Sequence, residues 1–157
     1  MMTEIIEQYP SFTTSRFSLC DHIIDPIIVS SEDVTFAFPE GFSIVGKDGY
    51  TISESGYVRI VGSSAHEDIN CWIIKRKATK QGSKLFGKPI SLSKLSLMMK
   101  RKGRKIQLFS EMYEQHRLYW RGVLLPCKLR GLSTWVIFET INDFQIEFGW
   151  KKPGNTD

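Results

Sequence analysis

Short segments in which apolar and polar residues alternate recur about every ten residues along this chain of 157 residues, with turn residues between them. In one of them, Val34, Phe36 and Phe38 alternate with smaller side chains, which places the three apolar groups on one face of a strand. No regular alternation of strands with long helices accompanies them. The pattern therefore predicts a mainly β (α+β) fold: a curled antiparallel sheet, barrel- or sandwich-like, with about eight short strands.

One α-helix is predicted, near residues 92–102. Its apolar residues recur at spacings of three and four and are Leu92, Leu95 and Met98 or Met99. Ser91 or Ser93 can cap the first turn, and Gly103 can adopt the left-handed conformation that often ends a helix. Because strand patterns dominate the rest of the chain, this helix should cover one opening or face of the sheet.

Turn residues predict where strands reverse direction. The Asp-Gly pair in residues 46–49 predicts a hairpin, because both residues tolerate positive φ. Asn142 and Asp143 predict a second tight hairpin, which would make the strands on either side of it neighbours. Pro26 interrupts an apolar segment and suits an edge strand, since proline cannot donate a hydrogen bond to a neighbouring strand.

The chain length suits one globular domain, residues 1–157, because two halves of about 75 residues would each have a marginal core. Residues 78–90 are rich in Lys, Gly, Ser and Gln, which predicts an exposed basic loop anchored by Leu85 and Phe86. We expect residues 1–10 and 151–157 to be frayed, because chain ends with little to bury are seldom well ordered.

Three features predict a cytoplasmic protein with reduced thiols. The chain begins with acidic residues where a secretion signal needs a cationic start and an apolar run. No charge-free stretch approaches the roughly 18 residues that a membrane span needs. Cys20, Cys71 and Cys127 are odd in number and widely spaced, which suits neither a disulfide framework nor a zinc knuckle.

Charge is segregated along the chain. Twelve of the 21 Lys and Arg residues lie between Lys75 and Lys105, and no Asp or Glu occurs from Ile69 to Ser110. Residues 1–74, by contrast, carry eleven acidic and three basic side chains. A segment with such a density of one sign repels itself unless water, the acidic half or an anionic partner screens it.

The basic segment contains the main candidate binding residues. Eight of them are predicted to contact phosphates or carboxylates: Lys75, Arg76, Lys77, Lys100, Arg101, Lys102, Arg104 and Lys105. Cations at the end of a helix also meet the negative end of its dipole, which explains some of this charge without a ligand. Contacts of this kind position a nucleic acid but do not read its sequence, and no finger, phosphate loop or RNA-recognition consensus accompanies them.

A second candidate lies in the aromatic C-terminal strands. Arg117, Tyr119 and Arg121 alternate on one face of a strand and could form the rim of a ligand site that holds a carboxylate or phosphate. The alternative is a surface ladder in which these arginines pair with Glu139 or Glu147. Both faces of the strand around Trp135 carry large apolar groups, which suits a covered central strand or a ligand-lined barrel interior.

Catalytic and metal motifs find little support. His22, His66 and His116 are isolated from each other in sequence, and no cysteine lies beside a recognisable base. The sequence also lacks a Gly-x-Ser-x-Gly elbow and a zinc deaminase signature. We therefore expect no metal, no cofactor and no catalytic residue.

These observations predict a non-catalytic intracellular binding module rather than an enzyme. Its basic loop and helix end would meet an anionic partner, either a nucleic acid or an acidic protein surface, without sequence-specific readout. One alternative is a protein-interaction or self-assembly subunit, in which the acidic half of one copy meets the basic segment of another to form a homo-oligomer. The other is a small-ligand β-barrel or an unrecognised enzyme that uses the aromatic C-terminal strands.

Overall fold

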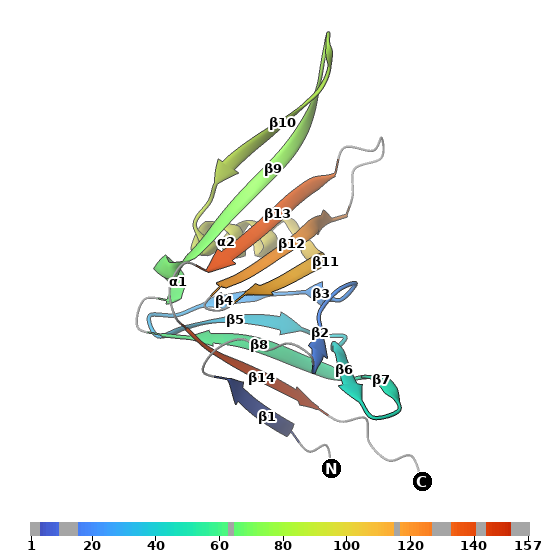
Figure 1. Ribbon diagram of the computed structural model, residues 1–157. Helices are drawn as coiled ribbons and strands as arrows, with labels where there is room; N and C mark the ends of the chain where they lie inside the picture. Colours follow the sequence, from blue (N-terminus) through green and yellow to red (C-terminus); the bar gives the residue numbers. More distant parts are fainter. Residues whose placement is uncertain are drawn as a thin grey trace.

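The computed structural model describes residues 4–9, 16–62, 65–114, 117–126, 133–140 and 144–151. In this part of the chain, fourteen strands form three antiparallel sheets, and two helices accompany them (Figure 1). The sheets do not close into a barrel but pack in a sandwich-like arrangement. The predicted mainly β fold is therefore confirmed, with more strands than predicted, because residues 4–9, 17–18 and 82–89 also form strands and one expected segment is divided at residues 25–26.

The first sheet has five strands. In spatial order they are β1 (Glu4–Tyr9), β14 (Gln145–Lys151), β8 (Ser55–Val61), β5 (Asp33–Phe38) and β4 (Ile27–Val29). The side chains of β5 alternate between buried and half-buried, as the spacing of Val34, Phe36 and Phe38 predicts.

The second sheet has six strands and contains most of the basic segment. In spatial order they are β10 (Gly82–Pro89), β9 (Ile69–Thr79), β13 (Thr134–Thr140), β12 (Arg117–Leu125), β11 (Lys105–Glu114) and β3 (Ile23–Ile24). Strand β10 therefore forms one edge of this sheet.

A small third sheet and two helices complete the described fold. The sheet contains β2 (Phe17–Ser18), β6 (Ser43–Gly46) and β7 (Gly49–Ile52), and the helices are α1 (Ala65–Asp68) and α2 (Leu92–Lys102). Gly46 pairs with Gly49 across the turn between β6 and β7, which confirms the hairpin predicted there.

The hydrophobic core lies between the five-stranded and six-stranded sheets. The ring of Phe36, from the first sheet, meets the rings of Trp120 and Phe138, from the second, edge to face at 5.0 and 5.3 Å between centroids. All three side chains are fully buried. Aromatic contacts of this type join the two sheets into one core.

Helix α2 begins and ends as the sequence predicts. Ser91 is its N-cap, and its side chain accepts a hydrogen bond from the backbone N–H of Lys94. Gly103 ends it with φ of 59°, in the left-handed region. The helix buries Leu92, Leu95 and Met99, and it contacts the edge strand β4 and strand β9.

Two predictions about connections are wrong. Residues 78–90 are not a loop, because β9 runs to Thr79, a two-residue turn follows, and β10 continues to Pro89. The apolar pair expected to anchor this segment is largely exposed: Leu85 is 59% and Phe86 is 47% exposed. The predicted hairpin at residues 142–143 lies outside the described residues, but its flanking strands β13 and β14 belong to different sheets and do not pair.

Predictions about the edges and ends of the fold have mixed outcomes. The segment containing Pro26 forms β3 and β4, each at the edge of its sheet, as the proline predicts. Residues 4–9 are not frayed, because β1 pairs with β14 along its full length. Residues 152–157, at the other predicted frayed end, lie outside the described residues. Neither described helix is long and apolar enough to cross a membrane.

Candidate anion-binding groove

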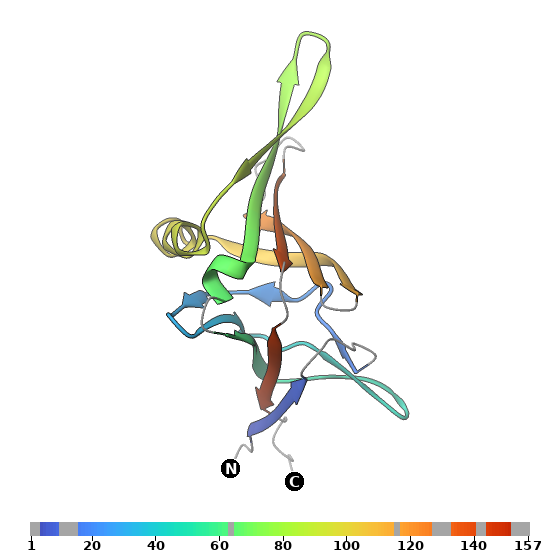
Figure 2. The same cartoon turned by 60° about the vertical axis from the view of Figure 1, so that its left-hand side comes forward.

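A long hairpin of β9 and β10 extends away from the body of the protein. Strand β9 pairs with β13 only as far as Lys75, which lies opposite Thr134. Beyond that point the residues of β9 pair with β10 alone, up to the turn between Thr79 and Gly82. Figures 1 and 2 both show this hairpin projecting past the ends of the neighbouring strands.

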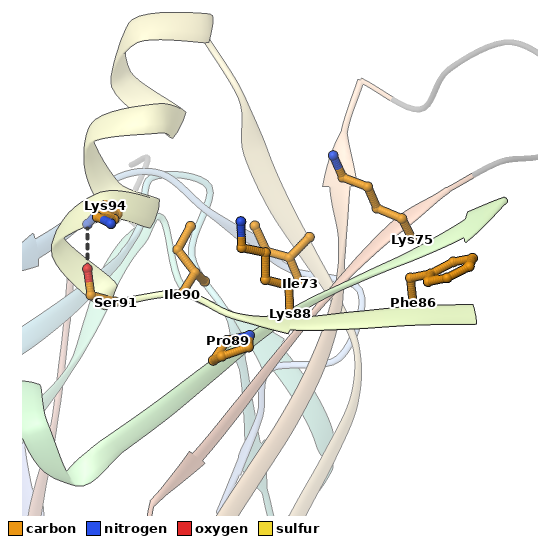
Figure 3. A pocket seen from close by; sticks show the side chains of 8 residues that line it. All are labelled: Ile73, Lys75, Phe86, Lys88, Pro89, Ile90, Ser91 and Lys94. Atoms are coloured by element: carbon orange, nitrogen blue, oxygen red, sulfur yellow. Dashed lines mark hydrogen bonds between the residues drawn. The ribbon is translucent and has the colours of Figure 1, made fainter. Parts of the chain in front are cut away.

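The register of the hairpin places several cations on one face. Lys75 lies opposite Phe86, and Ile73 lies opposite Lys88, so these four residues share a face of the ribbon. Figure 3 shows the amino groups of Lys75 and Lys88 extending to the same side. This is the side on which helix α2 begins.

A cavity of about 550 Å³ lies between the base of the hairpin and the start of α2 (Figure 3). Its lining residues are Ile73, Lys75, Phe86, Lys88, Pro89, Ile90, Ser91 and Lys94. The lining therefore combines apolar side chains with three ammonium groups. A site of this composition can surround an anion with charge while it packs against carbon.

A second cavity of about 340 Å³ continues along the helix. It shares Ile73, Lys75 and Ile90 with the first, so the two adjoin. Its remaining lining residues are Arg76, Met98, Lys102, Arg104, Leu124, Ser133 and Thr134. We call the two cavities together the cationic groove.

Six cations and no carboxylate line the cationic groove. They are Lys75, Arg76, Lys88, Lys94, Lys102 and Arg104. Within the part of the chain that the structure describes, none of the six forms an ion pair with Asp or Glu. The groove is therefore a region of positive potential without a described internal counterion.

The helix contributes its cations through a simple spacing. Lys94, Met98 and Lys102 follow each other at intervals of four residues, and side chains at that interval share a helix face. All three line the groove. Lys94 lies in the first turn of α2, where a cation opposes the positive end of the helix dipole at a cost of a few tenths of a kcal/mol.

Arg104 is held by backbone atoms at the other end of the groove. Its Nε donates a hydrogen bond to the carbonyl oxygen of Leu125 at 3.1 Å, and a terminal nitrogen donates to that of Pro126 at 3.4 Å. These bonds orient the guanidinium without neutralising its charge.

The structure thus brings four of the eight predicted anion-binding residues together and separates the others. Lys75, Arg76, Lys102 and Arg104 meet in the groove although β13 and β12 lie between β9 and β11. They meet because α2, which connects the end of β10 to the start of β11, contacts β9, and the residues at its end line the same cavity as Lys75 and Arg76.

Of the other four predicted residues, two lie on a different side of α2. Lys100 and Lys105 line a cleft of about 740 Å³ between the helix and β4. There the Lys105 Nζ lies 3.8 Å from a carboxylate oxygen of Asp25, so an acidic residue of the N-terminal half partly screens it. Arg101 is exposed and lines none of the described cavities, and the side chain of Lys77 lies outside the described residues.

Sequence reasoning missed two groove cations, Lys88 and Lys94. Lys94 could have been found because it precedes Met98 and Lys102 at intervals of four residues, which places the three on one helix face. Lys88 could have been found from the alternation of Lys84, Phe86 and Lys88, once residues 82–89 are recognised as a strand.

The residues of the predicted ligand rim have different partners. Arg117 pairs with Glu139, which is one of the two partners that the ladder alternative names. The Arg121 guanidinium lies over the Phe109 ring, 5.6 Å from its centroid, and one of its terminal nitrogens donates to the Ser110 hydroxyl.

A small hollow lies beside Arg117 and Tyr119. Its volume is about 200 Å³, and it is lined by Met112, Glu114, Arg117 and Tyr119. The Glu114 carboxylate among these residues disfavours an anionic ligand there.

A half-buried polar network lies toward the opposite edge of the six-stranded sheet. The Glu111 carboxylate accepts hydrogen bonds from the Tyr113 hydroxyl at 2.6 Å, the Leu19 backbone N–H at 2.9 Å and the Ser18 hydroxyl at 3.1 Å. The Trp120 indole N–H in turn donates to the Tyr113 hydroxyl at 3.1 Å. Burial, and then the Glu111 charge, raise the pKa of Tyr113 well above its usual value. Through the bonds to Glu111, this network connects residues 18–19 to β11.

His22 has a hydrogen-bonding partner, and Cys71 is buried. His22 Nε2 lies 2.9 Å from the Ser43 hydroxyl oxygen, and burial lowers the pKa of its imidazole. Burial raises the pKa of the Cys71 thiol to about 12, so it is a poor nucleophile at neutral pH. No group of three or more His, Cys, Asp or Glu residues suited to a metal ion occurs among the described residues.

Comparisons with known proteins give no further guide to the site. No protein family, curated protein or solved structure matches this chain.

Proposed function

We propose that the protein is a binding module that contacts the phosphate backbone of nucleic acid through the cationic groove, without reading the base sequence. The observation that carries this proposal is the set of six cations around one groove, with no carboxylate among its lining residues. Lys and Arg side chains that neutralise phosphates release counterions, and this release provides most of the affinity of non-specific nucleic-acid binding. The proposal also implies a role inside the cell, where nucleic acid is found.

The position of Lys94 supports a ligand at the helix start. A lysine in a first turn works against the helix dipole, and an acidic residue there would stabilise the helix instead. Residues that break a local preference often do so for function. A phosphate between Lys75, Lys88 and Lys94 would gain from all three ammonium groups and from the positive end of α2.

An acidic protein surface is the second candidate, and less supports it. If that surface were the acidic half of a second copy of this chain, its carboxylates would have to be free, yet several of them pair within the chain. Glu7 pairs with Arg16, and Asp33 pairs with Arg59. A polyglutamate competitor distinguishes this candidate, because it would displace an acidic protein partner but compete weakly with nucleic acid at equal charge.

A salt titration of binding to a mixed-sequence DNA duplex tests the proposed function. If all six cations contact phosphates, log K should fall with log salt at a slope of about −5, from about −0.9 per phosphate. The triple variant Lys75→Gln, Lys88→Gln, Lys94→Gln should reduce that slope by nearly 3. Fluorescence anisotropy at several salt concentrations measures both slopes.

The matched control removes three positive charges from the same segment but outside the groove. It carries Lys100→Gln, Arg101→Gln and Lys105→Gln, none of which lines the groove. Its slope should stay close to that of the unmodified protein. Equal losses in the two variants would show that net charge, and not the groove, drives binding, and the absence of binding at low salt would refute the proposal.

A further inference from the structure

The β9–β10 hairpin is a two-stranded ribbon with a free edge. It contains eight consecutive residue pairs, from Gly82 opposite Thr79 to Pro89 opposite Trp72. Strand β10 is at the end of the six-stranded order, so in the described structure no further strand pairs with its outer edge. Near the turn, none of the described strands lies beside the ribbon on either side (Figures 1 and 2).

Positive charge surrounds this ribbon. Lys84 and Lys88 lie on the same face of β10 as Phe86, and Lys75 lies opposite that ring. Lys80 lies in the turn, and Arg76 extends from the other face of β9 toward the end of β13. All of these described cations are exposed, and the sequence contains no acidic residue from Ile69 to Ser110.

This arrangement is unfavourable for the free protein. Lys75 lies diagonally across the ribbon from both Lys84 and Lys88 on the same face, and like charges this close in a pair of strands repel each other. An environment of phosphates on both sides would remove that repulsion. The ribbon therefore has the charge complementarity of a segment that lies between two phosphate backbones.

The width of the ribbon selects among nucleic acids. The major groove of B-form DNA, about 12 Å wide, accepts a two-stranded β-ribbon, whereas the minor groove of about 6 Å is too narrow. The major groove of A-form RNA is deep and too narrow for side chains to read. A single strand has no pair of backbones on either side of a ribbon.

We propose that the β9–β10 hairpin enters the major groove of B-form duplex DNA while the cationic groove holds one flanking backbone. This inference rests on the proposed function and names its ligand class. Phe86, 47% exposed and on the same face of the ribbon as Lys84 and Lys88, would meet base edges such as thymine methyl groups, which are apolar.

Four probes of equal length test the ligand class. They are a DNA duplex, the RNA duplex of the same sequence, the DNA single strand, and a DNA duplex whose cytosines carry a glucosylated hydroxymethyl group at C5. The unmodified DNA duplex should bind about tenfold or more tightly than each of the others at the same salt concentration, a difference of about 1.4 kcal/mol. The glucosyl group fills the major groove and should therefore weaken binding of the protein. As a control, a small molecule that occupies the minor groove of the unmodified duplex should leave binding of the protein unchanged.

A shortened hairpin tests the role of the ribbon. Replacing residues 77–84 by Asn-Gly joins the paired residues Arg76 and Leu85 by a two-residue turn and removes three lysines. The control Lys77→Gln, Lys80→Gln, Lys84→Gln removes the same charges and keeps the length. The control should keep the preference for DNA over RNA duplex, whereas the shortened protein should lose it.

Two outcomes separate this inference from the proposed function. Salt-dependent binding of all four probes with similar affinity, lost in the groove variant, would overturn the major-groove inference and leave the proposed function in place. Failure to bind any probe at low salt would overturn both. Unfolding curves of the two hairpin variants verify that the body of the protein is folded in each.

Discussion

Glu111 and Tyr113 illustrate, at the scale of single residues, how the fold holds polar groups in place for stability. The carboxylate and the phenol lie in a chain of hydrogen bonds that includes the Trp120 indole and the Leu19 backbone N–H. Because each group is bonded, the network can lie against the core without the large cost of an unsatisfied polar atom.

Tyr113→Phe should lower the free energy of unfolding at neutral pH by about 1–3 kcal/mol, because it leaves the Trp120 N–H without an acceptor. The folded pKa of Tyr113 is raised above its unfolded value near 10, so the contribution of this tyrosine is fully present below pH 10. It is lost as pH rises above 10, because the unfolded state ionises first. The difference between wild type and variant should therefore shrink in alkaline solution, as urea unfolding at several pH values would show.

Tyr50→Phe is the control for this measurement, since Tyr50 is 71% exposed on β7. It should change the free energy of unfolding little at any pH. A Tyr113→Phe difference that stays constant up to strongly alkaline pH would contradict the role assigned to the Tyr113 hydroxyl.

Helix α2 shows, at the scale of the element, which local signals are sufficient. Its length, its N-cap at Ser91 and its C-cap at Gly103 agree with the sequence pattern, because caps and apolar spacing are local properties. The sequence left Ser91 and Ser93 as alternative caps, and the hydrogen bond from the Lys94 N–H to the Ser91 hydroxyl decides between them.

Ser91→Ala should lower the free energy of unfolding by about 1 kcal/mol, the usual cost of removing an N-cap. Ser93→Ala is the matched control, two residues further along, and should change stability by less than about 0.5 kcal/mol. Thermal or urea unfolding of both variants measures the difference. Equal effects would contradict the assignment of the cap.

Strand β10 shows the opposite case, in which composition misleads. Its Lys, Gly and Ser residues are typical of loops, and alternation of charged residues on an exposed edge strand carries little hydrophobic signal. Pairing with β9 decides its structure, and that pairing also exposes Leu85 and Phe86. The segment is therefore exposed, as expected, but it forms a strand and not a loop.

The contact of Phe36 with Trp120 and Phe138 holds the two large sheets together at the scale of the whole molecule. Phe36→Ala should lower the free energy of unfolding by about 3–5 kcal/mol, because it leaves a cavity between the sheets. Phe109→Ala removes the same ring from a position that is 39% exposed and should cost about 1 kcal/mol. Denaturant unfolding compares them, and similar losses would argue against a shared core at Phe36.

Local sequence patterns were sufficient for the mainly β class, the boundaries of α2, the hairpin at residues 46–49 and the faces of β12, because caps, turns and alternation depend on neighbouring residues. The segregation of charge was also visible from the sequence alone. Only the tertiary structure decided which cations meet. It separated β13 from β14, joined Lys75 and Arg76 to Lys102 and Arg104 through α2, and placed Lys105 beside Asp25 instead. These are long-range pairings, which short strands of similar pattern leave undetermined because many registers and neighbours suit them equally well.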